Sequence, residues 1–170
     1  MSSALRPRAT FLVLAYNQEN YVREAIEGAF AQRCSSLEIL LSDDASSDGT
    51  YQVMLEMAAA YSGPHKVRTR RSSKNSGFIA HLRAAVTEAT ADVVILAAGD
   101  DVSFPDRSER TLTAFERDPA TMAVFSDISL AGRPAAVATH AAYIETKAFD
   151  MLLGAGGVGK GATYAYRKVC

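Results

Sequence analysis

Short apolar segments alternate with amphipathic ones along most of this chain, and this alternation restricts the fold more than any other feature. The apolar segments have the length and composition of strands; they span residues 10–15, 37–41, 93–98 and 123–126, and residues 67–70 could form a further short strand. The segments between them have the spacing of helices with one apolar face; they span residues 21–32, 50–61, 79–89 and about 103–117. A β-α-β-α order of this kind predicts an α/β fold, with a mainly parallel sheet flanked by helices.

The bulk properties favour one globular domain without a strong charge field. The chain has 170 residues and a net charge of −1, so no global basic field indicates a nucleic-acid partner or an anionic membrane. Residues 1–9 lack the apolar region of a signal peptide, and no segment approaches the length of a membrane span. We therefore expect a cytoplasmic chain that binds no nucleic acid and has no membrane span, with membrane association only in a longer form.

Polar side chains follow each of the first four predicted strands. The pairs are Tyr16-Asn17, Asp43-Asp44, Lys74-Asn75 and Asp100-Asp101. In open α/β sheets the carboxyl ends of parallel strands meet at one edge, where ligands collect. The sequence therefore predicts that these four segments converge on one binding site.

The pair Asp100-Asp101 has the character of a metal site. Two adjacent carboxylates repel one another and need a counter-charge, and a hard divalent cation can bind one or two carboxylates while phosphate oxygens complete its shell. Gly99 allows the backbone to turn sharply beside them. The alternative is a loop in which the aspartates cap the following helix.

The pair Asp43-Asp44 has two similar interpretations. A carboxylate at a strand end can accept hydrogen bonds from a nucleobase or from ribose hydroxyls. The following residues 46–49 also have the composition of a turn and a helix cap, which would make the pair structural.

Taken together, these segments resemble family 2 glycosyltransferases. The resemblance covers about residues 10–130 and rests on LVLAYNQENYVREAIEGAFAQ, LEILLSDDASSDGT, NSG and ILAAGDDVSFPDR in that order and spacing. It implies the Rossmann-like GT-A fold, a nucleotide-sugar donor, Mn²⁺ or Mg²⁺ and an inverting transfer. We expect a single domain over 1–170, in which 10–130 binds the nucleotide-sugar and 131–170 begins the acceptor side.

The resemblance also assigns roles to particular residues. Asp44 would contact the base with Asp43 beside it, and Asp100 and Asp101 would hold the ribose, the diphosphate and the metal. The expected nucleotide-sugar-binding set is Ala15, Tyr16, Asn17, Asp43, Asp44, Lys74, Asn75, Gly77 and Asp100, and the expected metal ligands are Asp100 and Asp101. A UDP-sugar is the first expectation for the donor, by its frequency in the family. The acceptor could be a saccharide, a lipid-linked molecule or a protein, and cell-envelope polysaccharide synthesis is the suggested setting.

The chain departs from the family pattern in ways that affect catalysis. Many relatives have an acidic residue where Ala98 stands and asparagine where Arg83 stands, and the family's catalytic base is a later aspartate. No acidic residue lies between Met151 and Cys170. We therefore expect a truncated chain that binds donor but transfers sugar very poorly, with the base beyond Cys170 and Asp127 as the candidate within the chain.

Two alternatives remain open on the sequence. The chain could be a catalytically silent nucleotide-sugar-binding module. It could also be a Rossmann-type NAD-binding protein that uses Gly154–Gly159, which formally match GxGxxG. That motif requires a strand before it and a helix after it, whereas here a short helix is predicted over 147–153 and a strand-like segment over 162–167.

Other charged residues have simpler interpretations. Arg68 and Arg70 are expected on a solvated edge, while Lys74 and Arg71 are the members of this basic cluster that could meet a diphosphate. The three histidines have no ligand spacing among themselves and are expected at the surface or on helices.

Overall fold

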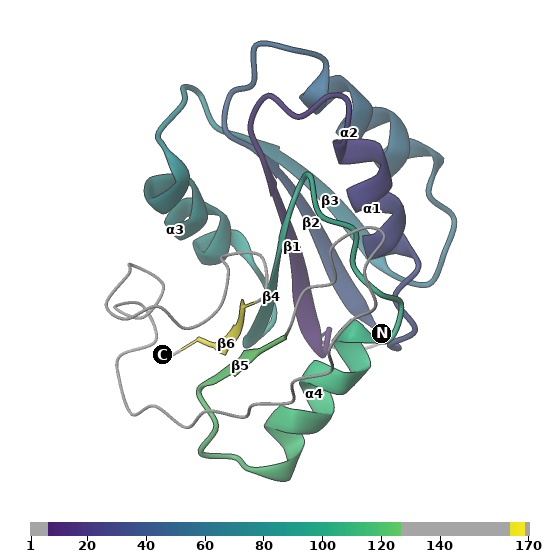
Figure 1. Cartoon of the computed structure of the whole chain (residues 1–170), viewed down its shortest axis with the longest axis vertical. Coiled ribbons are helices and arrows are strands. Elements are labelled where there is room, and N and C mark those ends of the chain that lie inside the picture. Colours follow the sequence, from purple (N-terminus) through teal and green to yellow (C-terminus); the bar gives the residue numbers. More distant parts are fainter. Residues whose placement is uncertain (1–6, 127–163, 169–170) are drawn as a thin grey trace, which may run out of the picture.

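The computed structural model describes residues 7–126 and 164–168 and shows a six-stranded sheet in the order β3-β2-β1-β4-β6-β5 (Figure 1). The strands are β1 (Ala9–Ala15), β2 (Leu37–Asp43), β3 (Lys66–Arg71), β4 (Val93–Ala98), β5 (Ala123–Phe125) and β6 (Tyr164–Arg167). The helices are α1 (Val22–Phe30), α2 (Thr50–Ala60), α3 (Phe78–Glu88) and α4 (Arg107–Arg117). The nine elements expected up to residue 126 are confirmed with shifted boundaries. The helix expected over 147–153 lies outside the described residues.

The central strand β1 is buried along its whole length because it has strands on both sides and helices on both faces. Its side chains alternate between two cores, as the two-residue period of a strand requires. Phe11 and Val13 belong to the core under α1, α2 and α4. Leu12 and Leu14 belong to the core under α3. This two-faced burial explains why the strand sequences are apolar runs rather than alternating patterns.

The last strand in the chain lies between two earlier ones. β1, β2, β3 and β4 pair in parallel, which confirms the mainly parallel sheet. β6 pairs antiparallel with both β4 and β5, so β5 does not touch β4 directly. The ring of Phe125 meets that of Tyr164 edge to face at 4.8 Å. The strand-like segment after residue 161 was expected, but its place in the sheet was not.

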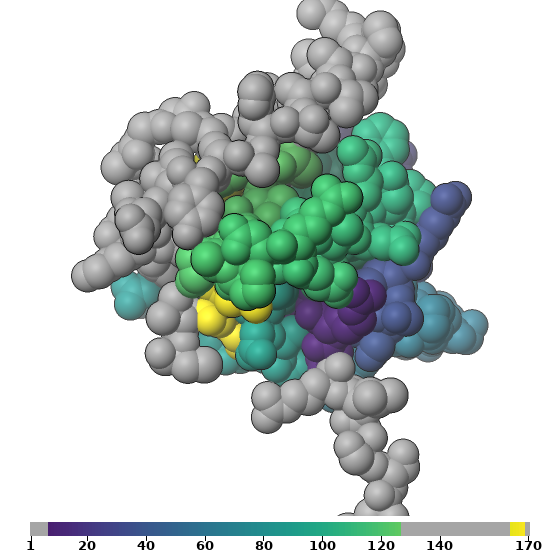
Figure 2. Space-filling model, turned by 90° about the horizontal axis from the view of Figure 1, so that it is seen from below, coloured from purple at the N-terminus to yellow at the C-terminus, as the bar shows by residue number. Residues whose placement is uncertain are grey.

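The amino and carboxyl ends of the parallel strands lie at opposite ends of the molecule. Figure 2 shows the molecule from below, where the start of the described chain (purple) lies near α4 (green) and β6 (yellow). The carboxyl ends of β1, β2 and β4 point to the opposite end of the molecule (Figure 1). Among the described residues, no helix has the length and apolar character needed to cross a bilayer.

One carboxylate is buried inside the sheet, close to its amino end. Glu38, the second residue of β2, is 0% exposed and accepts hydrogen bonds from the Thr10 hydroxyl at 2.6 Å and the Thr90 amide at 2.8 Å. Arg68 on β3 forms an ion pair with it at 2.8 Å. Burial raises the pKa of Glu38, but the hydrogen bonds from Thr10, Thr90 and Arg68 outweigh it, and the net pKa is lowered.

The arginines of β3 are engaged with acidic partners rather than free in solvent. Arg68 binds Glu38, and the Arg70 side chain is only 11% exposed and pairs with Glu88 at 2.9 Å. The expectation of a solvated edge is therefore wrong for this pair of arginines. Arg68 pairs with a fully buried carboxylate, which needs a charged partner, whereas the partner of Arg70 is an exposed carboxylate.

Candidate functional site

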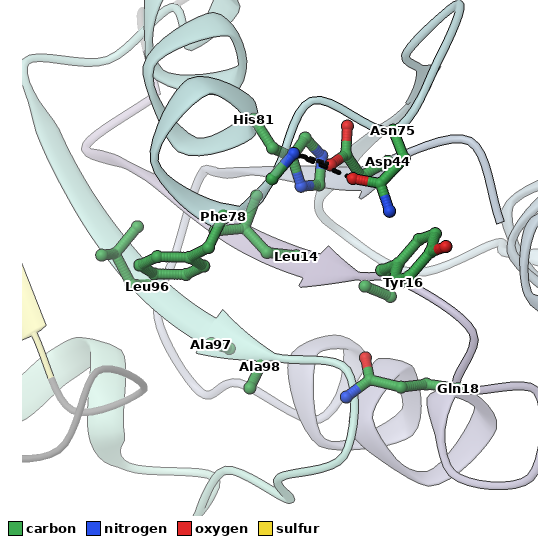
Figure 3. A pocket seen from close by; sticks show the side chains of 12 residues that line it. Leu14, Tyr16, Gln18, Asp44, Asn75, Phe78, His81, Leu96, Ala97 and Ala98 are labelled. Carbon is green, nitrogen blue, oxygen red and sulfur yellow. Dashed lines mark hydrogen bonds between the residues drawn. The ribbon is translucent and has the colours of Figure 1, made fainter.

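A cleft of about 310 Å³ opens at the carboxyl edge of the sheet, between the ends of β1 and β4 and the beginning of α3 (Figure 3). Its lining residues come from the ends of β1 and β4, from the segments that follow β1, β2 and β3, and from the first turn of α3. They are Leu14, Ala15, Tyr16, Gln18, Asp44, Asn75, Gly77, Phe78, His81, Leu96, Ala97 and Ala98.

The turns after β2 and β4 are both tied to the end of β1. The Asp44 amide donates to the Ala15 carbonyl at 3.0 Å, and the Gly99 amide donates to the Leu14 carbonyl at 2.8 Å. The turns that carry Asp44 and Asp100 therefore lie on the same edge of the sheet. Asp44, Ala98 and Tyr16 all line the cleft, whereas Asp100 and Asp101 follow Ala98 as exposed residues beyond it.

Asp44 holds the loop that leads into α3. Its carboxylate accepts hydrogen bonds from the amides of Ser76 and Gly77, both at 3.0 Å, and from the Ser76 hydroxyl at 3.0 Å. Gly77 has a φ of +80°, a conformation that glycine adopts easily. Burial raises the pKa of Asp44, but the hydrogen bonds from Ser76 and Ser72 outweigh it and lower the pKa overall. Asp44 is therefore a fixed negative charge at one end of the cleft.

His81 lies beside Asp44 at the same end of the cleft. It is 3% exposed, and its Nε2 lies 2.6 Å from the Ser42 hydroxyl, which also accepts a hydrogen bond from Arg70 at 2.8 Å. Burial lowers the pKa of His81, although the charge of Asp44 raises it. The imidazole is therefore neutral at pH 7. The histidines were expected at the surface or on helices. His81 does lie on a helix, but it lines the cleft and is not at the surface.

Asp43 is the last residue of β2, and its side chain has different partners from that of Asp44. It is 0% exposed, accepts a hydrogen bond from the Ser46 amide at 3.0 Å and pairs with Arg71 at 3.0 Å. Arg71 also donates to the Ser46 carbonyl at 2.6 Å and lies over the Tyr51 ring. Asp43 thus shapes the turn after β2, and its expected contact with the nucleotide remains a prediction.

Asn17 joins the loop after β1 to the loop after β2. Its backbone has a φ of 52°, its amide donates to the Ser46 hydroxyl at 2.9 Å, and its side-chain oxygen accepts from the Ser47 amide at 2.8 Å. Asp48 continues the connection by accepting from the Glu19 amide at 3.2 Å. The SDDASSDGT segment therefore fixes two loops to each other, and the expected nucleoside contact of Asn17 stays untested.

The Asp100-Asp101 turn is held in place from both sides. On one side, Gln32 donates to the Phe104 carbonyl at 2.9 Å and the Arg33 amide donates to the Pro105 carbonyl at 2.8 Å. On the other side, Arg107 donates to the Leu96 carbonyl at 2.6 Å. Burial lowers the pKa of Arg107 to about 10, while the charge of Asp101 raises it. The guanidinium stays charged at pH 7 and attracts Asp101.

Some expected site residues lie apart from the cleft or outside the described chain. Lys74 is exposed and does not line the cleft, although its neighbour Asn75 does. Asp127 and Gly154–Gly159 fall outside the described residues. Over the described ranges, no group of three or more histidine, cysteine, aspartate or glutamate side chains could hold a metal ion by itself.

Three buried or cleft residues were not singled out from the sequence. His81 and Gln18 line the cleft, and Gln32 supports the Asp100-Asp101 turn. A weak signal existed for His81, since it is a polar residue on the apolar face of its predicted helix. Gln18 and Gln32 carry no such signal because they lie at a loop and a helix end, where polar residues are common.

Gly99→Ala should lower the free energy of unfolding by about 1–3 kcal/mol, the usual range for overpacking. A Cβ at this position would lie 2.7 Å from the Cβ of Ala15 and 2.6 Å from the side-chain oxygen of Gln18. Ala15 cannot yield without moving β1. Urea unfolding curves measure the change, and Gly49→Ala is the control because its new Cβ would meet only the flexible end of Glu19. Equal losses in the two variants would contradict the prediction.

Two curated proteins are similar in sequence to part of this chain. EpsE of Bacillus subtilis (strain 168) is 32% identical over 111 residues, which are 65% of this chain and 39% of that protein. The succinoglycan biosynthesis protein ExoO of Rhizobium meliloti (strain 1021) is 32% identical over 129 residues, 75% of this chain and 36% of that protein. The chain thus spans between a third and two fifths of the length of these relatives.

Solved structures share the fold. The mannosyltransferase PcManGT from Pyrobaculum calidifontis, in complex with GDP-Man and Mn²⁺, superposes with a TM-score of 0.73 at 21% identity, over 96% of this chain and 45% of that chain. S. aureus TarS 1–349 in complex with UDP-GlcNAc gives a TM-score of 0.66 at 18% identity, over 94% of this chain and 45% of that chain. The fold is therefore the GT-A fold of glycosyltransferases.

The family model of glycosyl transferase family 2 matches residues 10–161. This match includes the glycines at 154–159, so they belong to the matched family region, and this weakens the NAD-binding interpretation. Most of the chain lies within the match, and the cleft lies at the sheet edge where the strand-end residues of the resemblance converge. The chain belongs to glycosyl transferase family 2.

Proposed function

We propose that this chain is the donor-binding part of a glycosyltransferase that takes a sugar from a nucleotide-diphosphate sugar, with Mn²⁺ or Mg²⁺, in an inverting transfer. In this proposal residues 10–130 bind the donor and 131–170 begin the acceptor side. The observation that carries it is the cleft that runs from Asp44 to Ala98, immediately before the Asp100-Asp101 turn. PcManGT with GDP-Man and TarS with UDP-GlcNAc share this fold.

The cleft has a polar end and an apolar floor suited to a nucleoside. Asp44 and His81 form the polar end, and Leu14, Leu96 and the half-exposed Phe78 supply apolar surface. Tyr16 is 45% exposed at the rim and offers a ring face on which a base can stack. The base would therefore lie toward Asp44, and the diphosphate toward Asp100.

The Asp100-Asp101 pair fits a divalent cation that is completed by its ligand. Both side chains are exposed carboxylates at a strand end, and they supply the oxygen donors that Mg²⁺ and Mn²⁺ prefer. Two carboxylates alone leave most of a six-oxygen shell open, so the donor's diphosphate and water would fill it. When bound, the cation would stabilise the negative charge of the leaving diphosphate.

The chain's own residues would hold the donor rather than activate the acceptor. Gln32 and Arg107 fix the Asp100-Asp101 turn, and Asp44 fixes the loop at the opposite end of the cleft. The acceptor hydroxyl needs a general base, and none of the cleft-lining residues other than Asp44 is a carboxylate. Asp44 is already bound to Ser76 and Gly77. We therefore propose that the base comes from residues outside this cleft. We also propose a polysaccharide acceptor, because the similar protein ExoO is a succinoglycan biosynthesis protein.

Asp101→Ala should remove the effect of Mn²⁺ on nucleotide binding. In the wild-type chain, UDP or GDP should bind more tightly with Mn²⁺ than with a chelator, because the cation bridges carboxylate and diphosphate. Isothermal titration calorimetry of both nucleotides, with Mn²⁺ and with EDTA, measures the ratio. In the variant the two affinities should become equal.

Asp92→Asn is the matched control. Asp92 is an exposed carboxylate just before β4, at the amino end of the same strand that ends beside Asp100. This variant should retain the Mn²⁺ effect. Equal affinity with and without metal in the wild-type chain would contradict the metal-bridged donor, and failure to bind either nucleotide would contradict the proposed function as a whole.

A further inference from the structure

Gln18 places an uncommitted amide in the cleft. Its side-chain oxygen is buried and has no hydrogen-bond partner among the described residues. Its backbone, in contrast, is fully engaged: the amide donates to the Thr50 hydroxyl at 2.7 Å, and the carbonyl accepts from the amides of Tyr21 and Val22 at 3.0 and 2.9 Å. Because these hydrogen bonds fix the backbone of Gln18, its side chain is held at the wall of the cleft, where a ligand can reach it.

Three other polar side chains of the cleft lining, those of Asp44, Asn75 and His81, already have partners. Asp44 binds Ser76 and Gly77, the Asn75 side-chain oxygen accepts from the Gly77 amide at 2.9 Å, and the His81 Nε2 lies beside Ser42. A buried acceptor without a partner is unfavourable. Gln18 therefore differs from its neighbours in needing a donor from a ligand or from water.

The position of the amide selects the part of a nucleotide that it can reach. Figure 3 shows Asp44 and His81 on one side of the cleft and Gln18 with Ala98 on the other, with Tyr16 between them. The Gln18 oxygen would lie only 2.6 Å from a Cβ at Gly99, the residue before Asp100. In a nucleotide the ribose is the group between base and diphosphate. With the base toward Asp44 and the diphosphate toward Asp100, the ribose lies at Gln18.

The chemistry of an amide suits that group. The Gln18 amide offers one acceptor oxygen and one NH₂ donor, and rotation about its last side-chain bond turns either toward the cleft. A ribose hydroxyl both donates and accepts, so it can pair with either atom of the amide, whereas a phosphate oxygen can pair only with the NH₂ group and leaves the oxygen without a donor. Ala98 has no polar atom in its side chain, so Gln18 is the polar side chain at this end of the lining.

We propose that the Gln18 amide binds the ribose hydroxyls of the donor and makes the site select ribonucleotides over deoxyribonucleotides. The proposal rests on the proposed function, because it requires a nucleotide in the cleft. It adds a residue that determines specificity for the sugar ring of the nucleotide.

The test compares ribose and deoxyribose ligands on two variants. Affinities for UDP and GDP, and for their 2′-deoxy and 3′-deoxy counterparts, are measured by calorimetry with Mn²⁺ on the wild-type chain, on Gln18→Ala and on Gln52→Ala. Gln52 is an exposed glutamine of α2 that binds Glu56 and does not line the cleft. The wild-type chain and Gln52→Ala should prefer the ribonucleotide by about three- to tenfold, the effect of one hydrogen bond. Gln18→Ala should bind all of them with the weaker affinity.

Each of the other outcomes contradicts either this inference or the proposed function. If Gln18→Ala keeps the preference, or loses affinity equally for ribo- and deoxyribonucleotides, the amide does not recognise the ribose and the inference is wrong. If the wild-type chain binds nucleotides without any ribose preference, the inference fails while the proposed function stands. If it binds no nucleotide at all, the proposed function fails and the inference fails with it. Thermal melting confirms that the variants are folded.

Discussion

Glu38→Ala should lower the free energy of unfolding by about 2–4 kcal/mol, because a buried donor left without its acceptor costs about 1–3 kcal/mol. The substitution takes away the acceptor of the Thr10 hydroxyl and of the Thr90 amide, and it leaves Arg68 without its counter-charge. These groups belong to β1, β3 and the turn before β4, so the loss affects four neighbouring strands at once. Urea unfolding followed by circular dichroism measures the change.

Glu38→Gln removes the charge of this side chain but keeps its size and shape. The pKa of Glu38 is lowered in the folded state, so its ionised form contributes stability above its unfolded pKa of about 4.3. That contribution is lost as the pH falls through the lower, folded pKa. The wild-type chain should therefore lose stability more steeply than Glu38→Gln on acidification below about pH 5. Parallel pH curves for the two proteins would show that folding does not lower the pKa of Glu38.

Gln32→Leu should destabilise the chain by about 2–4 kcal/mol, because it leaves several buried polar groups without partners. The amide of Gln32 is 4% exposed and satisfied on both sides. It donates to the carbonyls of Gly28 and Phe104, both at 2.9 Å, and it accepts from the amide and hydroxyl of Ser108 at 2.9 and 2.7 Å. Leucine has a similar volume but makes none of these bonds.

The same change should also weaken the effect of Mn²⁺ on nucleotide binding. Phe104 and Ser108 flank the helix start that follows Asp100 and Asp101, so loss of Gln32 releases one side of their turn. Unfolding curves and calorimetry with and without Mn²⁺ measure the two effects separately. Gln52→Leu, on the exposed face of α2, should alter neither. A Gln32→Leu variant of wild-type stability would show that these hydrogen bonds are replaced by water.

The strands and helices could be predicted because each is encoded locally. Val93–Ala98 is an uninterrupted apolar run, and the structure assigns β4 the same limits. The place of β6 could not be predicted, because the four residues Tyr164–Arg167 carry no local information about which earlier strand they pair with. Pairing with β4 and β5 depends on contacts that form only in the assembled sheet.

The sequence was sufficient to predict the edge of the sheet at which the site lies. It was not sufficient to predict the contacts of each side chain. Tyr16, Asp44 and Asn75 meet in the cleft because they follow neighbouring parallel strands. Asp43 and Asp44 were expected to act together, yet the two bind different partners. The loop partners of Asn17, however, depend on how two loops pack, which local patterns do not specify.

The insertion of β6 between β4 and β5 also orders events during synthesis. β1, β2, β3 and β4 can pair as soon as they leave the ribosome, since each lies next to an earlier or adjacent segment. The other side of β4 then presents the backbone of VVILAA until the much later β6 is made. An apolar strand with an open edge is a template for pairing with foreign chains. The nascent protein therefore carries an aggregation-prone edge from the synthesis of β4 until β6 arrives.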